Sequence, residues 1–182
     1  MKKFRKGFTL IELLIVVAII GALSAMMATS SSDAIDSSAA SAILNNLQTM
    51  KTAAFEMYMN VPEVASITTN VMIPNVTGST KVTIGTTETT VAKVLGERLG
   101  RVDIPANYGL TGNETNGWYV YYTFQTSDTT NVKNKLAAAA NKAGLLGVSM
   151  PIPSVFAALT SYYSNTSSGS TAAPSCIGLR VR

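Results

Sequence analysis

Histidine is absent from this chain of 182 residues, and Cys176 is its single cysteine. The lack of histidine excludes catalysis by a histidine acid, base or activated nucleophile, and it removes imidazole as a metal ligand. One cysteine cannot form a disulfide within the chain or a cysteine-based metal cluster. We expect Cys176 to be a buried thiol, and a disulfide to a second chain is the alternative interpretation.

Charged residues are also scarce, at 13% of the chain, whereas apolar residues make up 47%. Four of the 14 basic residues lie within the first six positions. The ten that remain balance the ten acidic residues, so the rest of the chain is formally neutral. Because no basic stripe is left to follow a phosphate backbone, nucleic-acid binding is not expected.

An apolar stretch of 21 residues, Phe8 to Ala28, follows the basic start, and Glu12 is its one strongly polar member. A helix of that length spans about 30 Å, the thickness of a hydrocarbon core. The basic residues before it are expected to hold the N-terminus in the cytoplasm. A cleaved secretory signal fits less well, because Leu23 or Met26 would lie at the third position before the candidate cuts.

The stretch KGFTLIELLIVVAIIG, Lys6 to Gly21, resembles the N-terminal segment of type IV prepilins and of the pseudopilins of type II secretion. A short basic leader, Gly7 before Phe8, and Glu12 at the fifth position of the mature chain carry the resemblance, over roughly residues 1–28. It implies that a prepilin peptidase cuts between Gly7 and Phe8 and then methylates the new amine of Phe8. It also implies that other pilin subunits and an inner-membrane assembly platform are partners, and that the product is a homo-oligomeric helical filament.

The resemblance further implies that Glu12 meets the Phe8 amine of a neighbouring subunit. Cleavage creates that positive amine, and the free N–H groups at the start of a helix also favour a nearby anion. Neither charge can stay unpaired in an apolar filament core. The alternative interpretation of Glu12 is a tolerated acid in an ordinary membrane anchor. Gly21 is either a site of close helix approach or a neutral spacer.

Three features depart from common pilin patterns. Many major pilins have proline 22 residues into the mature chain, where this chain has Thr29, so the helix either continues or loosens over Thr29–Ser32. Cys176 has no partner for a C-terminal disulfide loop. No acidic residue follows Asp128, so we expect no calcium site of the kind that several major pseudopilins have near the C-terminus.

Residues 33–60 show a second helical pattern, in which apolar side chains recur every three or four positions. Asp33 is a candidate cap for a restart of the helix, and Asn60 with Pro62 predicts its end. Joined, the two sections form one helix of roughly 80 Å. The predicted apolar stripe consists of Ile35, Ala39, Ile43, Leu47, Met50, Ala54 and Met57.

Beyond Pro62, β-branched and aromatic runs predict strands, and we expect the strand in WYVYYTF to be central or covered on both faces. Asparagine begins three glycosylation patterns, which so short a motif also produces by chance. The strands are predicted within 71–77, 81–85, 118–124 and 176–182, the helices within 91–99, 133–143 and 154–163, and the glycosylation patterns at Asn75, Asn113 and Asn165.

The expected fold is α+β and pilin-like, with a long N-terminal helix packed on a small antiparallel sheet with additional short helices. The chain divides into a leader (1–7), a membrane and filament-core helix (8–28), its amphipathic continuation (29–60) and a globular head (61–182). We expect a non-enzymatic subunit of a type IV pilus or related filament, without cofactor or metal, first in the membrane and then on the cell surface. The alternatives are a minor pilin or pseudopilin of a type II secretion or DNA-uptake machine, and an anchored binding domain that never polymerises.

Overall fold

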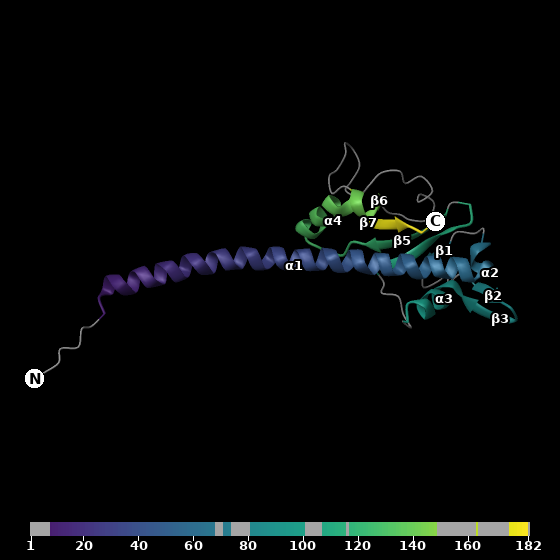
Figure 1. Cartoon of the computed structure of the whole chain (residues 1–182), viewed down its shortest axis with the longest axis horizontal. Helices are drawn as coiled ribbons and strands as arrows, with labels where there is room; N and C mark the ends of the chain where they lie inside the picture. Colours follow the sequence, from purple (N-terminus) through teal and green to yellow (C-terminus); the bar gives the residue numbers. More distant parts are fainter. Residues whose placement is uncertain are drawn as a thin grey trace, which may run out of the picture.

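A long helix carries a head over its second half, while its first half extends away from the head without cover (Figure 1). No side chain is described at residues 28–30, 71–73 and 148. The computed structural model describes residues 8–67, 71–73, 81–100, 107–115, 117–148, 163 and 175–181.

The helices pack beside antiparallel sheets, as in an α+β chain, and the layout matches the pilin-like fold expected from the sequence. In chain order they are α1 (Leu10–Asn60), α2 (Pro62–Ala65), β1 (Val71–Ile73), β2 (Lys81–Ile84), β3 (Thr87–Thr90), α3 (Val91–Arg98), β4 (Tyr108–Asn113), β5 (Gly117–Thr123), α4 (Thr130–Ala143), β6 (Leu146–Val148) and β7 (Cys176–Arg180).

Helix α1 is continuous from Leu10 to Asn60. It neither loosens over Thr29–Ser32 nor restarts at Asp33, so the expected cap at Asp33 is wrong. The Ser37 hydroxyl donates to the main-chain oxygen of Asp33 (2.8 Å), which satisfies the hydroxyl within the helix and leaves the helical backbone intact. The predicted end is confirmed, because α1 stops at Asn60 and a new turn begins at Pro62.

The predicted apolar stripe of α1 is buried from Ile43 onward. Ile35 is 68% exposed, so its predicted place in the core is wrong. The neighbouring Asp36 is buried instead, and its Oδ1 accepts a hydrogen bond from the Thr129 hydroxyl (3.0 Å) at the start of α4. Helix α4 therefore covers α1 on the side of Asp36 and leaves Ile35 outside.

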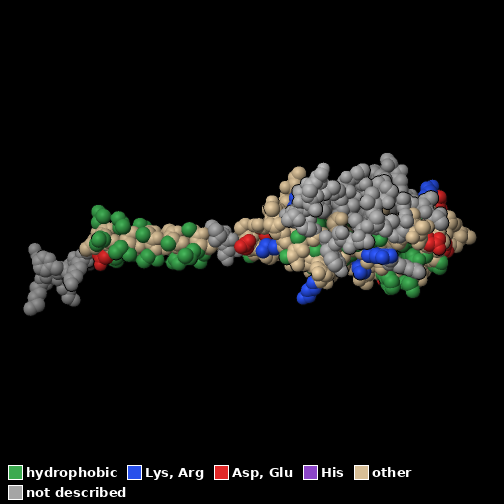
Figure 2. Space-filling model, turned by 90° about the horizontal axis from the view of Figure 1, so that it is seen from above, with side chains coloured by type: hydrophobic (Ala, Val, Ile, Leu, Met, Phe, Trp, Pro, Cys, Tyr) green, Lys and Arg blue, Asp and Glu red, His purple; other side chains and the backbone are tan. Residues whose placement is uncertain are grey.

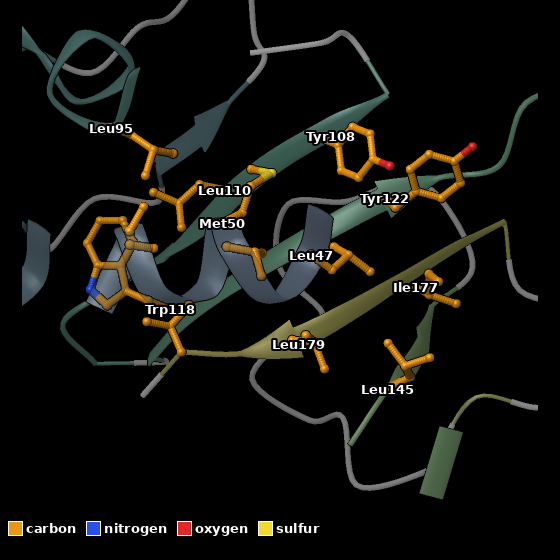
Figure 3. Packing of buried hydrophobic residues seen from close by; sticks show 14 of the residues in the cluster. Leu47, Met50, Leu95, Tyr108, Leu110, Trp118, Tyr122, Leu145, Ile177 and Leu179 are labelled. Carbon is orange, nitrogen blue, oxygen red and sulfur yellow. The ribbon is translucent and has the colours of Figure 1, made fainter. Parts of the chain in front are cut away.

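Five antiparallel strands form the main sheet in the order β1-β4-β5-β7-β6, and β2 pairs with β3 in a separate hairpin. Strand β5 is central, as predicted. Trp118 and Tyr122 face the core beneath α1, where Leu47 and Met50 pack between the sheet and the helix (Figure 3). Tyr121 is buried on the opposite face of the sheet, so β5 is covered on both sides as expected.

Strand β4 was not predicted, because its sequence YGLTGN lacks a β-branched or aromatic run. One of its glycines, Gly112, suits the close β4–β5 pairing. Gly112 has φ +144°, and a Cβ placed there would lie 2.7 Å from the Cα of Trp118 and still closer to the carbonyl oxygen of Gly117. No other residue type fits this position without moving one of the two strands.

The helices α3 and α4 confirm two of the three predicted short helices. Helix α4 begins three residues before the prediction because the Thr129 hydroxyl accepts from the Val132 N–H (3.2 Å) and caps it. Its end at Gly144 (φ +71°) follows the left-handed helix cap predicted from the sequence. The third predicted helix, over 154–163, lies outside the described residues except for Tyr163.

The structure also bears on the three glycosylation patterns. Asn113 is buried at the end of β4, so a glycan cannot be attached there on the folded head. A surface site at Asn113 is therefore wrong. Asn75 and Asn165 lie outside the described residues.

Candidate functional site

The candidate site begins at the start of α1, where Thr9 and Glu12 form a capping box. The Thr9 N–H and the Thr9 hydroxyl both donate to Oε2 of Glu12, at 2.8 and 2.7 Å. In return the Thr9 hydroxyl oxygen accepts from the Glu12 N–H at 3.3 Å. These bonds turn the Glu12 carboxylate back toward the first residues of the chain, and within the described residues its Oε1 accepts no hydrogen bond.

Thr9 was not singled out from the sequence, although the spacing T-x-x-E before an apolar run is a known signal for a capping box. The capping box therefore holds the carboxylate in place within the single chain. Phe8 precedes the cap and is 87% exposed, so the residue that would carry the new amine is accessible. Gly7 lies outside the described residues.

The first half of α1 is bare. Every described residue from Leu10 to Met27 is exposed, and most of these side chains are apolar (Figure 2). Among the described residues, α1 is the one helix long and apolar enough to cross a membrane. An apolar helix of this length is not stable in water alone, and it needs a bilayer or other apolar helices around it.

Gly21 lies within this bare half, and a Cβ placed on it would meet nothing within 4 Å. Its small size therefore has no use within a single chain. A glycine on an apolar helix lets another helix approach closely, which is consistent with a role between chains.

Residues 2–28 match the family model of the prokaryotic N-terminal methylation motif. The chain carries the signature of type IV pilins and pseudopilins. No curated protein and no solved structure matches the chain. The motif indicates a structural, pilin-like protein rather than an enzyme, and it implies processing by a prepilin peptidase and association with a membrane.

In the part of the head that the structure describes, the side chains of this pilin-like protein pack into a hydrophobic core. No group of three or more acidic, histidine or cysteine residues there is arranged to hold a metal ion. Cys176 is fully buried in β7, and burial raises the pKa of its thiol to about 12. The thiol is therefore neutral and inaccessible at ordinary pH, which disfavours a disulfide to a second chain.

Proposed function

We propose that this protein is a structural subunit of a type IV pilus or a related surface filament. In this proposal the chain is cut between Gly7 and Phe8, the Phe8 amine is methylated, and the apolar helix moves from the membrane into a filament core. The observation that best supports it is Glu12, a single carboxylate held by Thr9 at the start of an uncovered apolar helix.

The role of Glu12 follows from the cost of burying charge. Cleavage leaves a positive amine on Phe8, four residues before Glu12. When bare helices gather in a filament, both charges lose water, and an unpaired buried ion is strongly destabilising. Oε1 of Glu12 is available to the Phe8 amine of a neighbouring subunit, because Thr9 occupies only Oε2. A wrong axial stagger would leave both charges unpaired, so the pair selects one register.

The proposal assigns a task to each part of the chain. The leader (1–7) is removed, and the helix over 8–28 serves first as membrane anchor and then as filament core. The continuation over 29–60 carries the head, and the head over 61–182 forms the outer surface. The final location in this proposal is the cell surface, after passage through a single-span membrane form.

The test is the intact mass and N-terminal sequence of the protein from its native membrane and from sheared surface material. We expect sheared chains that start at Phe8 and carry one additional methyl group. A matched variant, Gly7→Leu, blocks the cut and should remain in the membrane with its leader. Chains found only in membrane and still starting at Met1 would contradict the proposal and favour an anchored domain that does not polymerise.

The same fractions separate the pilus subunit from the secretion alternative. A pilus subunit is abundant in sheared filaments, whereas a minor pilin or pseudopilin starts at Phe8 and stays largely with the cell envelope. Abundant processed chains in the sheared fraction support the pilus, and processed chains confined to the envelope support the alternative.

A further inference from the structure

A pocket lies at the end of the head that is farthest from the bare half of α1 (Figure 1). We name it the distal pocket, and its volume is about 300 Å³. Its walls come from the last turn of α1, from the β4–β5 turn with the start of β5, and from the end of β7. The residues that line it are Tyr58, Glu114, Thr115, Gly117, Trp118 and Arg180.

Two opposite charges line the distal pocket without pairing. Glu114 and Arg180 are both exposed. Neither side chain forms an ion pair or a hydrogen bond within the described part of the chain, whereas Arg98 and Glu56 elsewhere on the head pair at 2.8 Å. A carboxylate and a guanidinium that share a pocket and do not pair are both available to a third group.

Main-chain hydrogen bonds fix both charged residues beside the pocket. The Glu114 N–H donates to the main-chain oxygen of Ile67 (2.9 Å), which ties the β4–β5 turn to the segment after α2. The N–H of Val181, next to Arg180, donates to the main-chain oxygen of Trp118 (2.7 Å). The backbone at both residues is therefore already in place, and a preorganised site loses less entropy when a ligand binds.

Trp118 lines the distal pocket from the side of the core. It is 2% exposed, and its indole nitrogen is turned away from Met50 and Leu110, toward the margin of the cluster (Figure 3). The indole N–H is buried and has no acceptor within the described residues. Since buried donors are nearly always paired, an unpaired one beside a pocket is notable. A ligand oxygen at this wall would supply the acceptor that the chain does not.

We propose that the distal pocket binds a small zwitterion of the α-amino-acid class. The ligand carboxylate pairs with Arg180, and the ligand ammonium pairs with Glu114. The volume of about 300 Å³ equals the share of roughly ten water molecules in the liquid. A ligand of about ten non-hydrogen atoms therefore fits, and free amino acids are of this size.

Ligands that carry one charge or none fit the two lining charges less well. An anion such as phosphate would face the carboxylate of Glu114, and a metal cation or simple amine would face the guanidinium of Arg180. A neutral ligand would displace water from both charges without replacing its interactions. A zwitterion compensates both residues at once.

The test uses the full chain in detergent and the fluorescence of Trp118, the single tryptophan of the protein. The probes are free amino acids other than tryptophan, tyrosine and phenylalanine, whose own emission would interfere. We expect at least one of them to change the Trp118 emission in a saturable way at millimolar concentration. Its N-acetyl derivative lacks the ammonium and its amide lacks the carboxylate. Each should bind about threefold to fivefold more weakly, as expected for the loss of one exposed ion pair.

Two variants assign the two charges. Glu114→Gln and Arg180→Gln change exposed side chains, so the head should fold normally. Each should weaken binding of the amino acid by about threefold to fivefold. Arg180→Gln should not weaken binding of the amide, and Glu114→Gln should not weaken binding of the N-acetyl derivative, because each derivative lacks the matching charge. Glu97→Gln and Lys142→Gln are exposed controls outside the pocket and should bind the amino acid like the unaltered chain.

The melting temperature provides a second measurement, because a ligand that binds the folded chain raises it. An emission and a melting temperature that no amino acid changes would overturn the inference. Equal weakening by the control and the pocket variants would overturn it as well. The inference goes beyond the proposed function and does not depend on assembly, because all these measurements use single chains. A negative result here therefore leaves the proposed filament intact, and a chain that is absent from sheared material leaves the distal pocket intact.

Discussion

Replacing Glu12 by glutamine separates the two tasks that the structure and the proposal give to this residue. Glutamine also completes a capping box, so Glu12→Gln retains an acceptor for the Thr9 N–H and the start of α1 is kept. The variant removes the negative charge. In the proposed filament, the Phe8 amine of a neighbour would then be buried without a counter-ion.

The two tasks differ in magnitude. Removing one partner of a buried ion pair costs about 3–5 kcal/mol, which lowers an association constant by a factor of about one hundred to several thousand. Loss of a cap costs about 0.5–2 kcal/mol. Thr9→Ala removes the cap and keeps the charge, so we expect it to assemble far better than Glu12→Gln. Glu12→Ala should be only slightly worse than Glu12→Gln.

The assay is the ratio of sheared to membrane protein for the three variants, measured by immunoblot. N-terminal sequencing of the membrane pool provides the control, because each variant must start at Phe8 before assembly can be compared. If Glu12→Gln assembled within a few-fold of the unaltered chain while Thr9→Ala failed, the carboxylate would act as a helix cap and the charge argument would be refuted.

Three further predictions concern the head, measured on the full chain in detergent. Gly112→Ala should destabilise it by about 2 kcal/mol or more in chemical denaturation, because the new Cβ collides with β5. Thr129→Val removes the α4 cap and the hydroxyl that the buried Asp36 accepts from, so we expect a loss of about 2–4 kcal/mol, with Thr129→Ser close to the original. Burial raises the pKa of both Cys176 and Tyr121 to about 12, from unfolded values of 9.0 and 10.0. Both groups are neutral below their unfolded pKa values, and their contribution to the stability of the fold is complete in that pH range. Stability should therefore fall as the pH rises above about 9, and a melting temperature unchanged between pH 8 and pH 11 would contradict this.

Local signals in the sequence predicted much of the fold. The stop at Pro62, the glycine after α4 and the pattern of β5 each depend on residues next to one another in the chain, and each is confirmed. Strand β4 escaped prediction because pairing with β5, rather than its own propensity, makes it a strand. Glu12 of the candidate site was also found from a local signal, because it is the one strongly polar residue in an apolar run.

Ile35 and Asp36 show where such prediction ends. Periodicity alone places Ile35 in the buried stripe, because a helical pattern reports which residues share a face and not which face is covered. Helix α4 covers α1 at this level, and Thr129 at its start makes the hydrogen bond to Asp36, which lies 93 residues earlier in the chain. The Asp36 carboxylate can be buried there because the Thr129 hydroxyl donates a hydrogen bond to it. The hydrophobic pattern alone would have placed Ile35 in the core at this level of the helix.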